Sequence, residues 1–156
     1  MSGKRSLLLG VGNILLSDEG IGVRVIEKCE KEKALADVDI VDGGTAGMEL
    51  LDELACRPLV VIVDAIRSDD PPGTIHLLED DEIPKLFSQK LSPHQLGLSD
   101  VLSALVMTGE YPDRLFLVGV VPASIAPGIG LTDAIAAKVD PVARQVIMLL
   151  NGKEQL

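Results

Sequence analysis

Leu59-Val60-Val61-Ile62-Val63-Asp64 is the stretch that decides the fold of this 156-residue chain. Pro58 opens the run, five aliphatic residues follow, and an acid ends it. An uninterrupted Val, Ile and Leu run is typical of a parallel strand that helices cover on both faces, because an exposed face would require alternating polar residues. We therefore predict an α/β protein with residues 59–63 as one of its buried strands.

Two strand–helix units precede this strand. Residues 6–11 form an apolar run, and residues 21–29 carry apolar side chains at helical spacing, with Ser17 as the predicted N-cap. Residues 38–41 and 48–54 repeat the pattern as a strand and a helix. The pattern of residues 1–64 therefore predicts a βαβαβ unit with right-handed crossovers.

The second half of the chain predicts further elements around this unit. Residues 73–78 follow a short polar turn and are interpreted as an antiparallel edge strand, and residues 115–121 as the last strand. A loop at residues 92–99 enters a helix, and Thr132 is predicted to cap the final helix. The charged segment 79–90 is ambiguous. The helix after the 92–99 loop is expected to carry the apolar residues Val101, Leu102, Leu105 and Val106.

Composition and charge argue against several classes of protein. The length suits one compact domain over residues 1–156, and 47% of the residues are hydrophobic but only 2% aromatic. The formal net charge is −10 without a Lys/Arg cluster, so nucleic acid is not an expected partner. The apolar N-terminal stretch is too short for a signal or membrane segment, and the two cysteines form no disulfide framework. A cytoplasmic protein is expected.

Three residues of metal-binding type are expected to meet at one edge of the sheet. In open α/β sheets, ligands bind at the carboxyl ends of strands where the strand order reverses. Glu19 lies just after the loop of the first strand, Asp64 ends the third strand, and His94 stands in a Pro/Gly-flanked loop near a helix start. Two carboxylates and an imidazole suit a borderline transition metal and leave positions open for further ligands.

Each of these residues also has a structural explanation. An acid in the first turn of a helix, such as Glu19, complements the helix dipole. An acid at a strand end, such as Asp64, often caps the following turn, and a lone loop histidine such as His94 is more often not a ligand. The other histidine, His76, lies inside a predicted strand and is interpreted as structural. Residue type and position alone leave both explanations open.

The glycine loop after the first strand raises a different possibility. Gly10-Val11-Gly12 follows a strand, as in dinucleotide-binding folds, and Asp42 ends the second strand where a ribose-binding acid would stand. Leu15 replaces the third glycine of that fingerprint, which weakens this interpretation. A cysteine nucleophile is not favoured either, because neither Cys29 nor Cys56 has an obvious activating histidine.

Four segments, in this order, resemble the [NiFe] hydrogenase maturation endopeptidases. They are Gly10-Val11-Gly12-Asn13-Ile14-Leu15-Leu16-Ser17-Asp18-Glu19-Gly20-Ile21-Gly22-Val23, Asp42-Gly43-Gly44-Thr45-Ala46-Gly47-Met48-Glu49-Leu50-Leu51, Val63-Asp64-Ala65 and Ser92-Pro93-His94-Gln95-Leu96-Gly97-Leu98. The histidine segment has the form typical of the proteases for hydrogenase-2-type large subunits. The similarity covers residues 7–150. One departure is Val121 before Pro122, where many relatives carry Gln.

The resemblance implies both a fold and an activity. The fold is a single-domain, three-layer α/β/α arrangement of the phosphorylase/hydrolase type, whose five-stranded twisted sheet is mostly parallel with one antiparallel edge strand. The activity is removal of a C-terminal extension from the hydrogenase large-subunit precursor after nickel insertion, and Glu19, Asp64 and His94 contact the nickel. The precursor carries this nickel, so no permanently bound cofactor is expected. We further expect a monomer that has no membrane partner.

The catalytic base stays open on this evidence. Asp64 or Glu19 can activate water if its carboxylate is not used up as a metal ligand. Asp42, beside a Gly-Gly turn, is a third candidate for catalysis or positioning. The aspartic-type label of the family rests on essential acids and does not establish a two-aspartate dyad here. Three alternatives remain: a zinc hydrolase that keeps its own metal, a non-catalytic docking protein for the nickel centre, and a nucleotide-binding protein.

Overall fold

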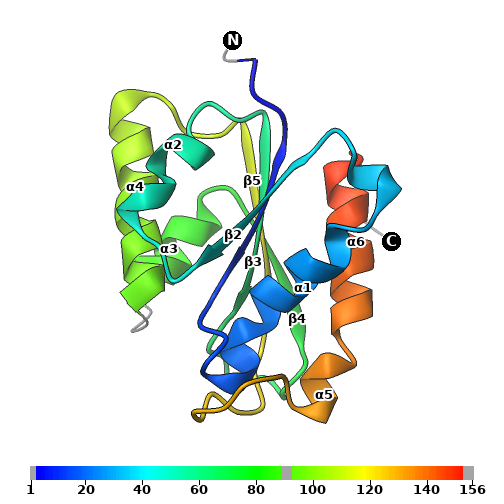
Figure 1. Ribbon diagram of the computed structural model, residues 1–156. Coiled ribbons are helices and arrows are strands. Elements are labelled where there is room, and N and C mark those ends of the chain that lie inside the picture. The colour runs from blue at the N-terminus through cyan, green and yellow to red at the C-terminus, as the bar shows by residue number, and fades with distance from the viewer. Residues whose placement is uncertain (1–2, 89–92, 153–156) are drawn as a thin grey trace.

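The centre of the molecule is a five-stranded sheet (Figure 1). The computed structural model describes residues 3–88 and 93–152. The strands are β1 (Leu7–Val11), β2 (Asp39–Gly44), β3 (Leu59–Ala65), β4 (Ile75–Glu79) and β5 (Arg114–Val120). Their order is β2-β1-β3-β5-β4, in which β4 runs antiparallel to β5 and the other pairs are parallel. The predicted mostly parallel sheet with one antiparallel edge strand is therefore confirmed.

Helices cover both faces of this sheet, as the predicted three-layer arrangement requires (Figure 1). One face carries α1 (Ile21–Cys29) and α6 (Val139–Leu150), which also pack against each other. The other face carries α2 (Leu51–Leu54), α3 (Glu82–Ser88) and α4 (Pro93–Thr108). Shorter helices complete the chain: η1 (Ser17–Gly20), η2 (Lys33–Leu35), η3 (Met48–Leu50) and α5 (Asp133–Ala136).

Strand β3 shows why a continuous aliphatic run is needed. Successive side chains of a strand point to opposite faces of the sheet. Val60 and Ile62 join the core beneath α4, whereas Val61 and Val63 join the core beneath α1, and all four are fully buried. Burial of each side chain contributes about 1.5–3 kcal/mol relative to leaving it exposed. The strand therefore carries the acid that follows, Asp64, into a buried position.

Glycines allow α1 to pack directly on the strands. A Cβ atom at Gly22 would lie 2.2 Å from the carbonyl oxygen of Val63 and 2.5 Å from that of Val11. A Cβ atom at Gly10 would lie 2.4 Å from the carbonyl oxygen of Gly22. Gly10, within β1, is thus explained by close contact between helix and strand, without a dinucleotide. This contact brings η1, and with it Glu19, against β3.

Two local predictions differ from the structure. Ser17 does not cap a helix: it is the first residue of η1, with a φ of 53°, and its hydroxyl donates to the carbonyl oxygen of Ala126. The final helix is two helices, α5 and α6, and Thr132 is the N-cap residue of α5, but its hydroxyl donates to Asp18. α4 carries Val101, Leu102, Leu105 and Val106, as expected, although Val106 is 64% exposed.

The remaining ambiguous segment, 79–90, contains the last residue of β4 and then α3. Residues 89–90, and Ser92 of the predicted 92–99 loop, lie outside the described residues. Among the helices that the structure does describe, none has both the length and the apolar character needed to cross a membrane.

Candidate active site

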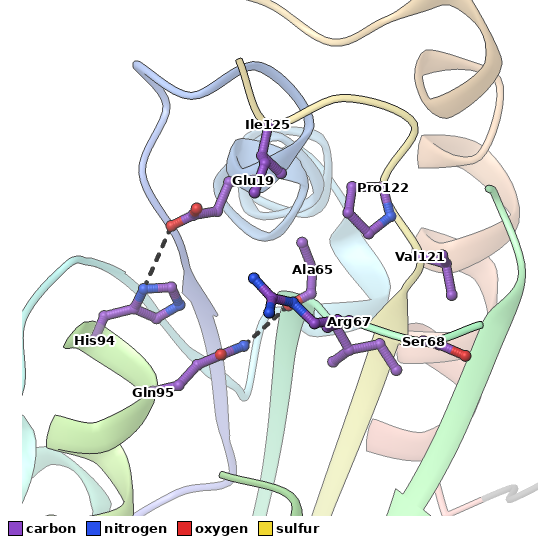
Figure 2. A pocket seen from close by; sticks show the side chains of 10 residues that line it. Glu19, Ala65, Arg67, Ser68, His94, Gln95, Val121, Pro122 and Ile125 are labelled. Atoms are coloured by element: carbon purple, nitrogen blue, oxygen red, sulfur yellow. Dashed lines mark hydrogen bonds and ion pairs between the residues drawn. The ribbon is translucent and has the colours of Figure 1, made fainter. Parts of the chain in front are cut away.

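Three separate elements bring Glu19, Asp64 and His94 together. Glu19 lies in η1, Asp64 is the last but one residue of β3, and His94 is the second residue of α4. The prediction that His94 stands in a loop is wrong, because α4 begins at Pro93. Proline suits the first position of a helix, where its missing N–H has no partner to lose. The first turn of α4 holds the imidazole beside Glu19 (Figure 2).

The imidazole of His94 lies between the two acids. Its Nδ1 is 3.5 Å from Oε1 of Glu19, and its Nε2 is 3.2 Å from each carboxylate oxygen of Asp64. The side chains of Asp64, His94 and Glu19 are 0%, 2% and 15% exposed. The strand-end argument predicted that these side chains share one cleft, and the structure places them there; their chemical roles remain predictions.

The electrostatics of this cluster follow from its burial. Burial raises the pKa of Asp64, and the opposing effects of the hydrogen bonds from His94 and Gln95 do not cancel it. For His94, burial alone would lower the pKa, but the hydrogen bond and charge of Asp64, with the charge of Glu19, raise it overall. Both directions favour a proton held between Asp64 and His94, where each group compensates the other for the loss of water.

The three groups form a chain and not a closed metal cage. In the described part of the protein, no set of three or more His, Cys, Asp or Glu side chains is arranged to hold a metal ion. The reason is that the two nitrogens of His94 face different acids, whereas ligands of one ion must all point at the same place. Two carboxylates and an imidazole still match a borderline divalent metal in chemical type. Capture of an ion therefore requires the partly exposed Glu19, or the His94 ring, to turn.

Gln95 is a member of the site to which sequence reasoning gave no role. Its side chain is buried, and its amide Nε2 donates to Oδ2 of Asp64 at 3.0 Å and to the carbonyl oxygen of Ala65 at 3.1 Å. The amide has two N–H groups, so both are used and the Asp64 carboxylate is held in one orientation. The sequence feature that could have indicated a role for Gln95 is its position next to His94, at the start of a largely apolar helix.

Asp18 was also missed, because it resembles an ordinary acid at a helix start. It is fully buried and accepts hydrogen bonds from the backbone nitrogens of Ala123, Ser124 and Thr132, at 2.9, 3.0 and 2.7 Å. One carboxylate therefore fixes the loop that follows β5 against η1, the element that carries Glu19. No local pattern predicts this contact, since its partners lie more than a hundred residues away.

The structure does not bring Asp42 into this cluster. Asp42 is exposed near the end of β2, and its Oδ1 accepts a hydrogen bond from the backbone nitrogen of Gly44 at 2.9 Å. It lines a separate depression together with Asn13 and Thr45. His76 lies in β4, where its Nε2 is 2.8 Å from Oδ2 of Asp70, which fits the structural role expected for it.

A pocket of about 230 Å³ opens beside Glu19 and His94 (Figure 2). Arg67 and Ser68 add polar groups to its lining, and Gln95 lies at its edge beneath His94. The rest of the lining is apolar and comes from Ala65, Ile66, Val121, Pro122 and Ile125. The site thus joins a buried, charged cluster to an open space that a substrate can enter.

Comparison with known proteins agrees with this geometry. The hydrogenase maturation protease family model matches residues 23–149. The hydrogenase 2 maturation protease of Escherichia coli K12 is 56% identical over 149 residues, which cover 94% of this chain and 91% of that protein. A hydrogenase expression/formation protein of Rhizobium leguminosarum bv. viciae is 43% identical over 89% of this chain and 70% of its own length.

Solved structures lead to the same family. The hydrogenase maturating endopeptidase HybD from Escherichia coli superposes with a TM-score of 0.90 at 52% identity, covering 95% of this chain and 93% of that one. The [NiFe] hydrogenase maturation protease HybD from Thermococcus kodakarensis has a TM-score of 0.78 at 25% identity, covering 94% and 99%. Sequence and fold together show that this chain belongs to the hydrogenase maturation protease family and is a peptidase.

Proposed function

We propose that this peptidase removes the C-terminal extension of a [NiFe] hydrogenase large-subunit precursor after nickel has been inserted, and that it recognises the nickel that the precursor carries. The family supports a role in hydrogenase maturation. The observation that carries the finer proposal is the contact of His94 with both Glu19 and Asp64 beside an open pocket. The metal belongs to the substrate, so the peptidase itself holds no permanent cofactor.

The chemistry of the cluster supports recognition of a metal that another protein delivers. A nickel ion held by thiolates of the precursor can accept oxygen and nitrogen donors from Glu19, Asp64 and His94. An ion bound by these groups would replace the contacts that His94 makes with Glu19 and Asp64. If the nickel contributes about 4 kcal/mol to binding, the loaded precursor is preferred roughly a thousandfold over the empty one.

The two acids differ in what they can reach. Asp64 is fully buried and fixed by Gln95, which suits it to hold the ion together with His94. Glu19 is partly exposed and lines the pocket, which supports it as the acid that accepts a proton from attacking water. A carboxylate has two oxygens, and Glu19 can contact the ion with one while the other acts as the base. Asp42, outside the cluster, is a candidate for positioning the substrate.

The test is incubation with nickel-loaded and nickel-free precursors, read by intact mass. We expect loss of a C-terminal peptide only from the loaded precursor. Equal cleavage of both samples would remove the recognition role of nickel, and tight binding without any mass decrease would favour a docking protein.

Two variants test the residues, and one serves as the control. Glu19→Gln and His94→Ala are expected to lower the processing rate by about 100-fold or more while the circular dichroism spectrum stays unchanged. His76→Ala removes the other histidine, which lies in β4 outside the cluster, and is expected to process normally. Normal processing by His94→Ala would contradict the assignment.

A further inference from the structure

The exposed large hydrophobic side chains of this protein are concentrated at one end of the molecule. In the described part of the chain, eight such side chains are exposed, and six of them follow the carboxyl ends of β1, β2 and β5 or lie in the first turn of α4. The loops after β1 and β5 and the start of α4 share the lower end of the molecule in Figure 1. Single exposed hydrophobic residues are normal, but a group of them at one place marks an interaction site. We call this group the apolar patch: Ile14, Leu15, Met48, Leu96, Ile125 and Ile129.

Backbone contacts join the segments that carry the apolar patch. The backbone nitrogen of Gly128 donates to the carbonyl oxygen of Leu15 at 2.9 Å, so the loop after β5 is paired with the loop after β1. A Cβ atom at Gly97 would lie 3.0 Å from the Cα of Gly47, so the chain just before Met48 lies directly against the start of α4. The patch is therefore held in shape before a partner arrives, which lowers the entropy cost of binding.

The apolar patch borders the catalytic cluster. Ile125 lines the pocket beside Glu19 and His94 and points toward it from the loop after β5 (Figure 2). A Cβ atom at Gly20 would lie 3.0 Å from the Cα of Ile14, so Ile14 packs against the turn that carries Glu19. The patch is thus continuous with the site at which this peptidase is proposed to cut.

The depth of the cluster determines what must cover the patch. The side chains of Asp64 and His94 are 0% and 2% exposed, so they lie below the surface, and a substrate reaches them through the pocket beside His94. The proposed substrate holds its nickel through thiolates, so the ion is fixed to the folded body of the precursor and is not carried on a free tail. Bringing that ion to His94 brings the surface around it against the apolar patch.

We therefore propose that the apolar patch is a docking surface for the folded body of the hydrogenase large-subunit precursor, and that it covers an apolar surface around the precursor's metal centre. The proposal rests on the proposed function, because it takes the nickel-loaded precursor as the substrate. Removal of apolar surface from water stabilises the complex without regard to the metal. The patch therefore supplies affinity for the precursor, whereas the nickel supplies the discrimination between loaded and empty forms.

The experiment measures kcat and KM for processing of the nickel-loaded precursor by wild type, Leu15→Asp and Ile129→Asp. Both residues belong to the apolar patch, neither lines the pocket beside the cluster, and they are 58% and 79% exposed, so the substitutions leave the core intact. Each variant is expected to raise KM by about tenfold or more with an unchanged kcat, because docking would bury an unpaired charge against hydrocarbon. Circular dichroism and thermal unfolding check the fold of each variant.

Met107→Asp is the matched control. Met107 is 87% exposed, but it lies near the far end of α4, about 20 Å along the helix from His94. This variant introduces the same charge on an exposed hydrophobic residue outside the apolar patch, and we expect it to keep the wild-type KM.

The outcomes separate this proposal from the proposed function. A wild-type KM in either patch variant, a loss confined to kcat, or an equal rise in KM for Met107→Asp would overturn the docking surface while cleavage of the loaded precursor continued. Sedimentation equilibrium of the protein alone is expected to show a monomer. A dimer that Leu15→Asp separates would assign the patch to a second copy of this chain and also overturn the proposal. Failure of wild type to cleave the loaded precursor would instead refute the proposed function itself.

Discussion

The carboxylate of Asp18 binds both the backbone nitrogen and the hydroxyl of Thr132, at 2.7 Å and 2.8 Å, across 114 residues of sequence. The same carboxylate accepts hydrogen bonds from the backbone nitrogens of Ala123 and Ser124. A single buried side chain thus joins η1 to the loop that forms the apolar wall of the pocket. The acid next to Glu19 in sequence therefore shapes the site without lining the pocket.

Asp18→Ala is expected to lower the free energy of unfolding by about 3 kcal/mol, because it leaves several buried donors without an acceptor. Urea denaturation followed by circular dichroism measures this change. Asp133→Ala is the matched control, since Asp133 is an exposed acid in the first turn of α5. Equal denaturation midpoints for the two variants would show that the buried carboxylate does not secure the loop.

Gly22→Ala is expected to destabilise the protein by about 2 kcal/mol or more, although alanine is the better helix former. The new Cβ would press on carbonyl oxygens of Val63 and Val11, which belong to the sheet backbone and cannot move aside. Gly128→Ala serves as the control, because its Cβ would come no closer than 3.2 Å to another atom, the Oγ of Ser17, and would lie 3.9 Å from the carbonyl oxygen of Ala126. Thermal unfolding of both variants compares the two sites, and a Gly22→Ala protein as stable as wild type would refute close helix–strand packing.

The stability contribution of Asp39 is expected to depend on pH. Hydrogen bonds from Arg57 and then Arg5 hold the pKa of Asp39 below its usual value, and Arg57 is itself only 5% exposed. A depressed pKa in the folded state means that the contribution is complete above about pH 4, the pKa of an unfolded Asp, and disappears as the pH falls through the folded pKa.

Asp39→Asn should therefore be less stable than wild type at neutral pH, and this difference should shrink in acid. Urea midpoints at several pH values measure it. Asp37→Asn, an exposed neighbour, should follow wild type throughout. A difference between Asp39→Asn and wild type that stays constant across this pH range would contradict the pairing with Arg57.

The two cysteines are expected to differ in reactivity toward a chromogenic aromatic disulfide. Cys29 is buried in the core, and burial raises the pKa of its thiol to about 11, so little thiolate forms near neutral pH. Cys56 is exposed. The folded protein should release one equivalent of chromophore quickly, and Cys56→Ser should abolish that release. Fast reaction of the Cys56→Ser protein before unfolding would contradict the burial of Cys29.

The strands were predictable because each has a direct signature in sequence. Runs such as residues 59–63 are continuous since both faces of β3 are covered, and the short polar turn before β4 signalled a change of direction. Helix details were harder, because they depend on tertiary contacts. Serine is a residue type typical of helix N-caps, but the hydroxyl of Ser17 donates to the carbonyl oxygen of Ala126, which lies in a distant loop. Val106 has the apolar character of a core residue, but it lies on an exposed part of α4.

The site was predictable to the extent that parallel topology places strand ends together. That rule located Glu19 and Asp64 on one rim, and the strength of the motif around His94 added the third residue. The rule gave no information about side-chain direction, so it could not separate Asp42, which is exposed, from Asp64, which is buried. Gln95 and Asp18 act through hydrogen bonds to partners distant in the chain, and such contacts have no spacing that a sequence reveals.

Glu19, Asp64 and His94 come from η1, β3 and α4, and the wall beside them is secured only after Thr132 has reached Asp18. A ribosome-bound chain that lacks its final third therefore has the acids but not the assembled cleft. The pocket beside the cluster is thus built from segments near both ends of the chain, so its wall exists only when the protein is folded as a whole.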